Sequence, residues 1–122
     1  MITIYRKNII QALGELASYE FQKLAWFEND QGLCSAYDED VEAVYDGTGL
    51  HEALRDGKIA FSKEADAVLR SLEKACDKIG YNRDERELID APEMEALRQL
   101  AAKALALVLA ADGSESTVEI ID

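Results

Sequence analysis

His51 is the first residue whose neighbours resemble a chemical motif, because Glu52 follows it directly and Arg55 stands four positions after it. Metalloprotease helices place two histidines four residues apart to hold zinc, with a glutamate beside the first as general base. Here Arg55 replaces the second histidine, and the chain has no other. Two-histidine zinc chemistry is therefore excluded. We expect His51 to be a surface residue on a short helix, since no nearby Ser or Cys pattern supplies a nucleophile for it to activate.

The acids between Asp38 and Asp46 resemble a calcium loop in composition but not in spacing. An EF-hand loop that begins at Asp38 needs glycine at its sixth position and glutamate at its twelfth, where this chain has Ala43 and Gly49. Acids four residues apart, such as Asp38 and Glu42, could serve acid–base catalysis, but a solvated helix face has the same spacing. We expect no catalytic residue, no metal site and no cofactor. A hydrolase that uses a divalent cation at these acids is the least favoured alternative.

Negative charge is concentrated in one segment of the sequence. The chain has a net charge of −12 at neutral pH, and between residues 28 and 56 only Arg55 is basic. The acids of this segment are Glu28, Asp30, Asp38, Glu39, Asp40, Glu42, Asp46, Glu52 and Asp56. Acids at this density repel one another unless solvent or a cationic partner compensates them. Nucleic-acid binding needs clustered Lys and Arg, so this composition predicts that the protein does not bind nucleic acid.

Helical periodicity places part of this charge on one face. In a helix over residues 36–45, the acids Asp38, Glu42 and Asp46 are four residues apart and form a ridge. Aromatic side chains bracket the ridge, at Trp26, Phe27, Tyr37 and Tyr45. Tyr and Trp are common anchors of protein interfaces, but aromatics are equally typical of the core of small helices. Both interpretations remain open for these four residues.

The elements that position these residues are all predicted to be helical. Apolar residues recur at three- and four-residue spacing, which indicates helices over about 4–16, 18–27, 36–45, 50–55, 62–79 and 92–111. Ser18, Ser35 and Ser62 are predicted N-caps, and Asp90 before Pro92 is a further one. The fold class is therefore all-α, a bundle of five or six helices. The helix after Pro92 carries only Lys103 as a charge in its second half, so we expect it to be central and mostly covered.

Length and composition predict a single helical domain over residues 1–122, with residues 113–122 as an extended tail or short strand. Residues 1–5 can also be extended, and pairing of the two termini is a less favoured alternative. No apolar stretch is long enough to span a membrane and no secretion signal is visible, so we expect a cytoplasmic protein without membrane contact. Cys76 fits a core position of its helix, and Cys34 falls in a predicted loop after the turn at 29–32.

The stretch from Tyr19 to Ile79 resembles small bacterial immunity-type proteins. The resemblance depends on the order of its features: Glu20-Phe21-Gln22 with Trp26, a glycine turn, Ser35, an acidic helix, Asp46-Gly47 leading into Leu50 to Leu54, and a long amphipathic helix. In such families a helical acidic protein binds and neutralises a toxin, often a basic nuclease. The resemblance implies that the toxin-facing residues are Asp38, Glu39, Glu42, Tyr45, Asp46 and Glu52.

The predicted function is accordingly inhibition of a cationic protein, such as a toxin, by occlusion through an acidic surface and without catalysis. The alternative is a homodimeric structural or adaptor protein, or one that resembles a secretion chaperone. A dimer formed through the Leu105 to Leu109 region would favour this second view.

Overall fold

The computed structural model describes residues 1–28, 35–111 and 118–120. Within these residues lie seven α-helices, one π-helical turn and two short strands. In chain order they are β1 (Ile2–Ile4), α1 (Arg6–Leu16), α2 (Tyr19–Lys23), η1 (Leu24–Glu28), α3 (Tyr37–Tyr45), α4 (Leu50–Arg55), α5 (Lys63–Ile79), α6 (Glu85–Leu88), α7 (Pro92–Ala110) and β2 (Val118–Ile120). The predicted all-α class is confirmed. The helix that the sequence did not predict is α6, whose four residues are too few to show a period.

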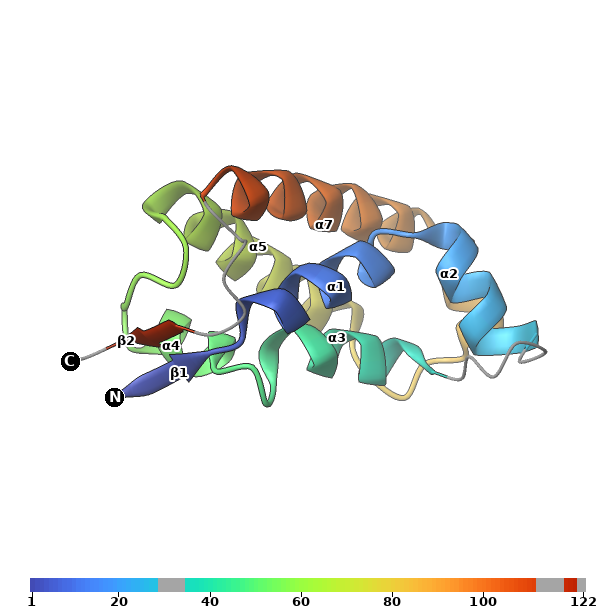
Figure 1. The fold of residues 1–122 in the computed structure, drawn as a ribbon. Helices are drawn as coiled ribbons and strands as arrows, with labels where there is room; N and C mark the ends of the chain where they lie inside the picture. Colours follow the sequence, from blue (N-terminus) through green and yellow to red (C-terminus); the bar gives the residue numbers. More distant parts are fainter. Residues whose placement is uncertain (29–34, 112–117, 121–122) are drawn as a thin grey trace.

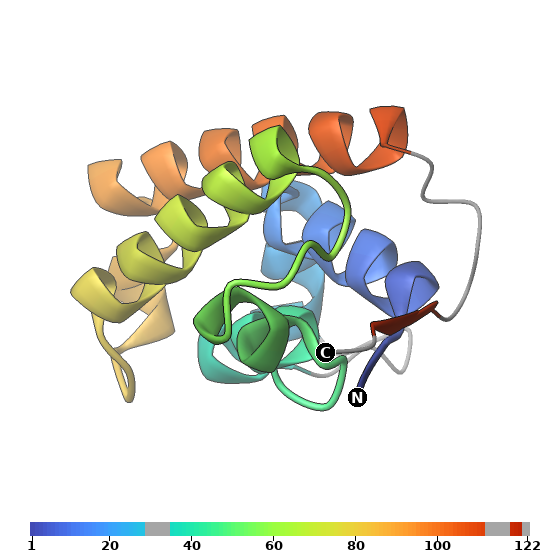
Figure 2. The same cartoon turned by 90° about the vertical axis from the view of Figure 1, so that its left-hand side faces the viewer.

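Three long-range helix pairings organise the molecule. Helix α1 lies between α7 and α3, and α5 runs alongside α7 (Figures 1 and 2). Each of these helices has apolar residues at three- and four-residue spacing on one face, and these faces pack together in one shared core. Burial of each large apolar side chain stabilises the fold by about 1.5–3 kcal/mol relative to exposure. Fully buried members of the core include Ile9, Leu13, Leu16, Leu69, Leu72, Leu88 and Met94.

Two of the four predicted N-caps are confirmed. The hydroxyl oxygens of Ser18 and Ser62 each accept a hydrogen bond from the backbone N–H three residues later, at 3.0 Å. The prediction for Ser35 is wrong, since Ala36 precedes α3 and makes no side-chain cap. The prediction for Asp90 is also wrong, because Ala91 is the N-cap of α7 and the Asp90 carboxylate instead accepts a hydrogen bond from the Tyr19 hydroxyl at 3.1 Å.

The two termini pair with each other, which was the less favoured expectation. Strands β1 and β2 are antiparallel, with Ile2 opposite Ile120 and Ile4 opposite Val118. Ile2 and Ile4 are buried on the same side of β1, as the period of two in a strand requires. The first helix therefore begins at Arg6, after the strand, rather than near residue 4.

Helix α7 is less covered than expected. It packs on α5 and α1, but its outward face is exposed at Ala102, Ala106 and Leu109, the last with 54% of its surface accessible. The prediction that most of its circumference is covered is wrong. Alanine made the pattern ambiguous, since it is compatible with both a core and a solvated helix face.

Several remaining expectations concern single residues or segments. Cys76 is fully buried in α5, as predicted. The turn at 29–32, Cys34 and residues 113–117 of the tail lie outside the described residues. Among the described helices, none combines the length and the hydrophobicity that crossing a bilayer requires.

Candidate functional site

An acidic groove of about 350 Å³ lies between α3 and α5. Its lining residues, which define the name "acidic groove" below, are Asp38, Val41, Glu42, Tyr45, Asp46, His51, Glu73, Asp77 and Tyr81. Helix α3 and its C-cap supply the first five, α4 supplies the histidine, and α5 with the segment after it supplies the rest. Three of the sequence-predicted ridge acids are thus brought into one site.

Two ridges with the same spacing line the acidic groove. Asp38, Glu42 and Asp46 follow one another at four-residue intervals on the α3 side. Glu73 and Asp77, with Tyr81 four residues further on, do the same on the α5 side. Side chains four apart on a helix share a face, so each helix presents a row of carboxylates to the same hollow. The site gathers five carboxylates in all.

Tyrosines join α3 to α5 beneath the acidic groove. The Tyr37 hydroxyl donates to the Cys76 carbonyl at 3.0 Å, and the Tyr45 hydroxyl donates to the Leu69 carbonyl at 2.7 Å. Burial raises the pKa of both phenols, so both remain protonated donors at neutral pH. Tyr45 is only 3% exposed. Tyr45 therefore forms part of the floor of the groove and does not project from the surface as the toxin-facing residue that the resemblance implied.

The carboxylates of the acidic groove have no Lys or Arg partner in the described part of the chain. No Lys or Arg lines the hollow, and the contacts within it come from neutral or titratable donors. His51 Nδ1 lies 2.5 Å from Glu73 Oε2, the Tyr81 hydroxyl donates to Asp77 at 2.8 Å, and the Asn82 backbone N–H donates to Asp38 at 3.2 Å. The Asp77 carboxylate adds to burial in raising the pKa of Tyr81. The negative charge is therefore left for solvent or a ligand to compensate.

Two other predicted contact residues lie beside the acidic groove. Glu39 is exposed on α3 but does not line the hollow. Glu52 lines an adjoining hollow that shares Asp46 and His51 with the acidic groove. The nearest cation to Glu52 is Arg55, at 3.9 Å, which is closer to Asp56 at 3.0 Å. Glu52 thus extends the acidic surface past the end of α3.

Asp40 is the one acid of α3 that faces the interior. Its residue is 5% exposed, and one carboxylate oxygen accepts a hydrogen bond from the Trp26 indole N–H at 2.8 Å. Burial raises the pKa of Asp40 to about 6, although the indole hydrogen bond opposes the shift. The Trp26 ring meets the rings of Phe27 and Tyr37 edge to face, at 6.3 and 6.4 Å between centroids. This cluster is structural, and it fixes α3 against η1.

Sequence reasoning missed the α5 side of the site. Glu73 and Asp77 stand on the predicted helix 62–79, and Tyr81 completes a four-residue repeat that was present in the sequence. That repeat was a usable signal, because it matches the repeat of Asp38 and Glu42 on α3. What the sequence lacked was any indication that these two faces meet.

The side chains that line the acidic groove are mainly carboxylates, with two tyrosines and one histidine. The lining includes no Ser, Thr, Cys or Lys, so His51 has no nucleophile beside it to activate. In the described residues, no three His, Cys, Asp or Glu side chains are grouped so that they could hold a metal ion. The groove offers a dense array of negatively charged hydrogen-bond acceptors, which form strong hydrogen bonds with cationic donors.

Comparison with protein-family models, with curated proteins and with solved structures finds no match to this chain.

Proposed function

We propose that this protein binds a cationic segment of another protein in the acidic groove and inhibits that partner by occlusion. The observation that carries the proposal is the pair of facing carboxylate ridges, five acids without a Lys or Arg among the lining residues. In this proposal the protein acts as an immunity-type inhibitor of a cationic toxin. The partner's Lys and Arg side chains are engaged by the groove and are no longer available to their own substrate.

The electrostatics of the acidic groove favour a partner with more than one positive charge. A single exposed ion pair contributes only about 0–1 kcal/mol, because desolvation and side-chain ordering offset the attraction. Several carboxylates in one hollow add a second gain, since a bound cation also relieves their mutual repulsion. Arg suits such a site well, because its planar guanidinium can bond two carboxylate oxygens at once.

The proposal is tested with paired charge-reversal variants. Glu42→Lys combined with Asp46→Lys changes the groove, and Glu64→Lys combined with Glu87→Lys changes two exposed acids outside it by the same net charge. The probe is a short fluorescent oligoarginine peptide, and fluorescence anisotropy gives its Kd at low and moderate salt. We expect the groove variant to weaken binding about ten-fold or more, roughly 0.7 kcal/mol per carboxylate, and to flatten the salt dependence.

The control variant distinguishes the effect of where the substituted acids lie from the effect of the net charge of the protein. It should weaken binding by about two-fold or less, since only the long-range field changes. Equal losses in the two variants would show that the peptide senses net charge alone, and the acidic groove would then not be the binding site.

A second candidate function is a homodimeric adaptor, and the exposed face of α7 is the observation that favours it. Leu109 is 54% exposed beside the exposed alanines at 102, 106 and 110. Light scattering would give the mass in solution, and Leu109→Lys should convert a dimer to a monomer. A monomeric mass for the unaltered protein at high concentration removes this candidate and leaves the first intact.

A further inference from the structure

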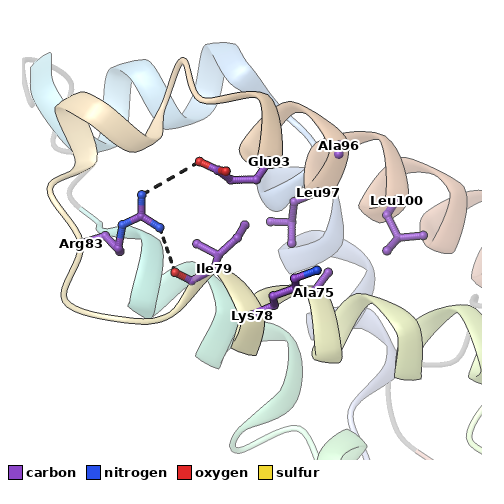
Figure 3. Close-up of a pocket in the computed structure, with 8 residues that line it drawn as sticks. All are labelled: Ala75, Lys78, Ile79, Arg83, Glu93, Ala96, Leu97 and Leu100. Carbon is purple, nitrogen blue, oxygen red and sulfur yellow. Dashed lines mark hydrogen bonds and ion pairs between the residues drawn. The ribbon is translucent and has the colours of Figure 1, made fainter.

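A second groove lies on the other side of α5, between that helix and α7 (Figure 3). Its volume is about 400 Å³. The lining residues, which define the "α5–α7 groove", are Ala75, Lys78, Ile79, Arg83, Glu93, Ala96, Leu97 and Leu100. It shares no residue with the acidic groove.

Large and small apolar side chains together line the α5–α7 groove. Ile79, Leu97 and Leu100 form its walls, while Ala75 and Ala96 leave the space between the two helices unfilled. On α7 the lining runs from Glu93 to Leu100, which at 1.5 Å per residue is about 10 Å. A short apolar chain fits this length, whereas a docked helix would contact only about two turns.

Positive charge borders the α5–α7 groove, on a protein whose net charge is strongly negative. Arg83 stands at one end, where it donates to the Ile79 carbonyl at 2.9 Å and lies 4.0 Å from Glu93 (Figure 3). Lys78 lies along the α5 edge, is exposed, and has no acidic partner within the described ranges. The two cations outnumber the single acid of the lining. The local charge is therefore opposite to that of the whole chain.

From this combination we propose that the α5–α7 groove binds a small amphipathic carboxylate. The apolar chain of the ligand lies over Ile79, Leu97 and Leu100, where its burial supplies the affinity. The carboxylate lies between Lys78 and Arg83, which fix its direction in the groove. This site is independent of the acidic groove and does not depend on the function proposed above.

Decanoate below its micelle concentration is the probe, and amide chemical shifts in the ¹⁵N-labelled protein are the readout. We expect saturable shifts at Ala75, Ala96 and Leu97 and smaller ones in α3. Decyltrimethylammonium carries the same chain with the opposite charge, so it should not produce these shifts. Because the protein as a whole attracts cations and repels anions, preference for the anion identifies local recognition.

Variants that each remove one charge test whether positive charge at the groove attracts the carboxylate of decanoate. Lys78→Gln should raise the Kd for decanoate about two- to five-fold, and Glu93→Gln should lower it, because Glu93 competes for Arg83. Lys74→Gln is the matched control, an exposed lysine one turn earlier on α5 that does not line the groove. The proposal is overturned if both amphiphiles shift the same amides, or if the two lysine variants behave alike. Shifts of these amides with protein concentration instead would show that a second copy covers the groove, and would overturn it too.

Discussion

Replacing the buried Asp40 by Asn should stabilise the protein at neutral and alkaline pH. The carboxyl is almost inaccessible, and one of its oxygens accepts a hydrogen bond from the Trp26 indole N–H at 2.8 Å. Asparagine keeps an acceptor oxygen for that bond and removes the charge that burial makes unfavourable. The substitution therefore preserves the geometry while it removes the penalty.

The magnitude follows from the pKa of Asp40. Burial raises this pKa from 3.8 to about 6, and one pKa unit corresponds to 1.36 kcal/mol. The folded state then binds the proton more tightly than the unfolded state. Burial of Asp40 therefore does not lower the free energy of unfolding below about pH 4, where the carboxyl is protonated in both states. It lowers that free energy most above about pH 6, where the carboxyl is ionised in both. The upper limit is about 3 kcal/mol at pH 8. We expect Asp40→Asn to gain about 1–2 kcal/mol there, since its buried amide N–H groups need partners of their own.

Urea unfolding followed by far-UV circular dichroism measures this gain. The free energy of unfolding of Asp40→Asn minus that of the unaltered protein should increase as the pH rises from about 4 to about 7 and then level off. Glu39→Gln is the matched control, because it removes one charge from the adjacent, exposed position of α3. The control should show a difference within about 0.5 kcal/mol at every pH.

Two outcomes would refute this reasoning. A difference that does not change with pH would mean that Asp40 has the same pKa in both states. A loss of stability in Asp40→Asn above pH 7 would mean that the ionised carboxylate is held by favourable interactions. The single tryptophan provides an independent check, since its emission should titrate with a midpoint near pH 6 only when Asp40 is present.

Two further predictions concern stability. Arg98→Ala should destabilise the fold by about 2–4 kcal/mol. Buried Arg98 donates to the Gln22 side chain at 2.9 Å, and its loss leaves that amide oxygen buried without this partner. A change under about 1 kcal/mol in urea unfolding would contradict this prediction. Gly49→Ala should cost about 2–3 kcal/mol, because Gly49 has φ +80° and a Cβ there would collide with the Thr3 carbonyl. Gly57→Ala, at φ +74° in open space, is its control and should cost about 1 kcal/mol, so equal melting temperatures in the two variants would exclude the collision.

Helical periodicity and local caps account for what the sequence could predict. Helix α5 shows this most clearly, since Ser62 caps it, Leu69 and Cys76 lie on its buried stripe, and Gly80 ends it with a positive φ. These features depend on neighbours within a few residues, so they can be recognised without tertiary information. The cap at Asp90 failed for the opposite reason, because its carboxylate is bound to the hydroxyl of Tyr19, 71 positions away.

The candidate site could be predicted only on its α3 side. The four-residue spacing of Asp38, Glu42 and Asp46 was sufficient to place those acids on one face. The α5 side depends on which face of α5 meets α3, and the Tyr37 and Tyr45 hydroxyl bonds to α5 carbonyls determine that. Such contacts join residues 24 and 39 positions apart, and no local pattern encodes them.

If the proposed function is right, the acidic groove is the surface that a cationic protein contacts. Zero-length carbodiimide cross-linking of the protein with the partner that co-purifies from its native cell tests this most directly, because the reagent joins a carboxylate to a lysine in direct contact. Mass spectrometry of the products should place the links at Glu42, Asp46, Glu73 and Asp77, each to a lysine of the partner. Links confined to acids outside the groove, such as Glu20, Glu64 and Glu87, would show that the partner contacts a different surface and that the proposed function of the groove is wrong.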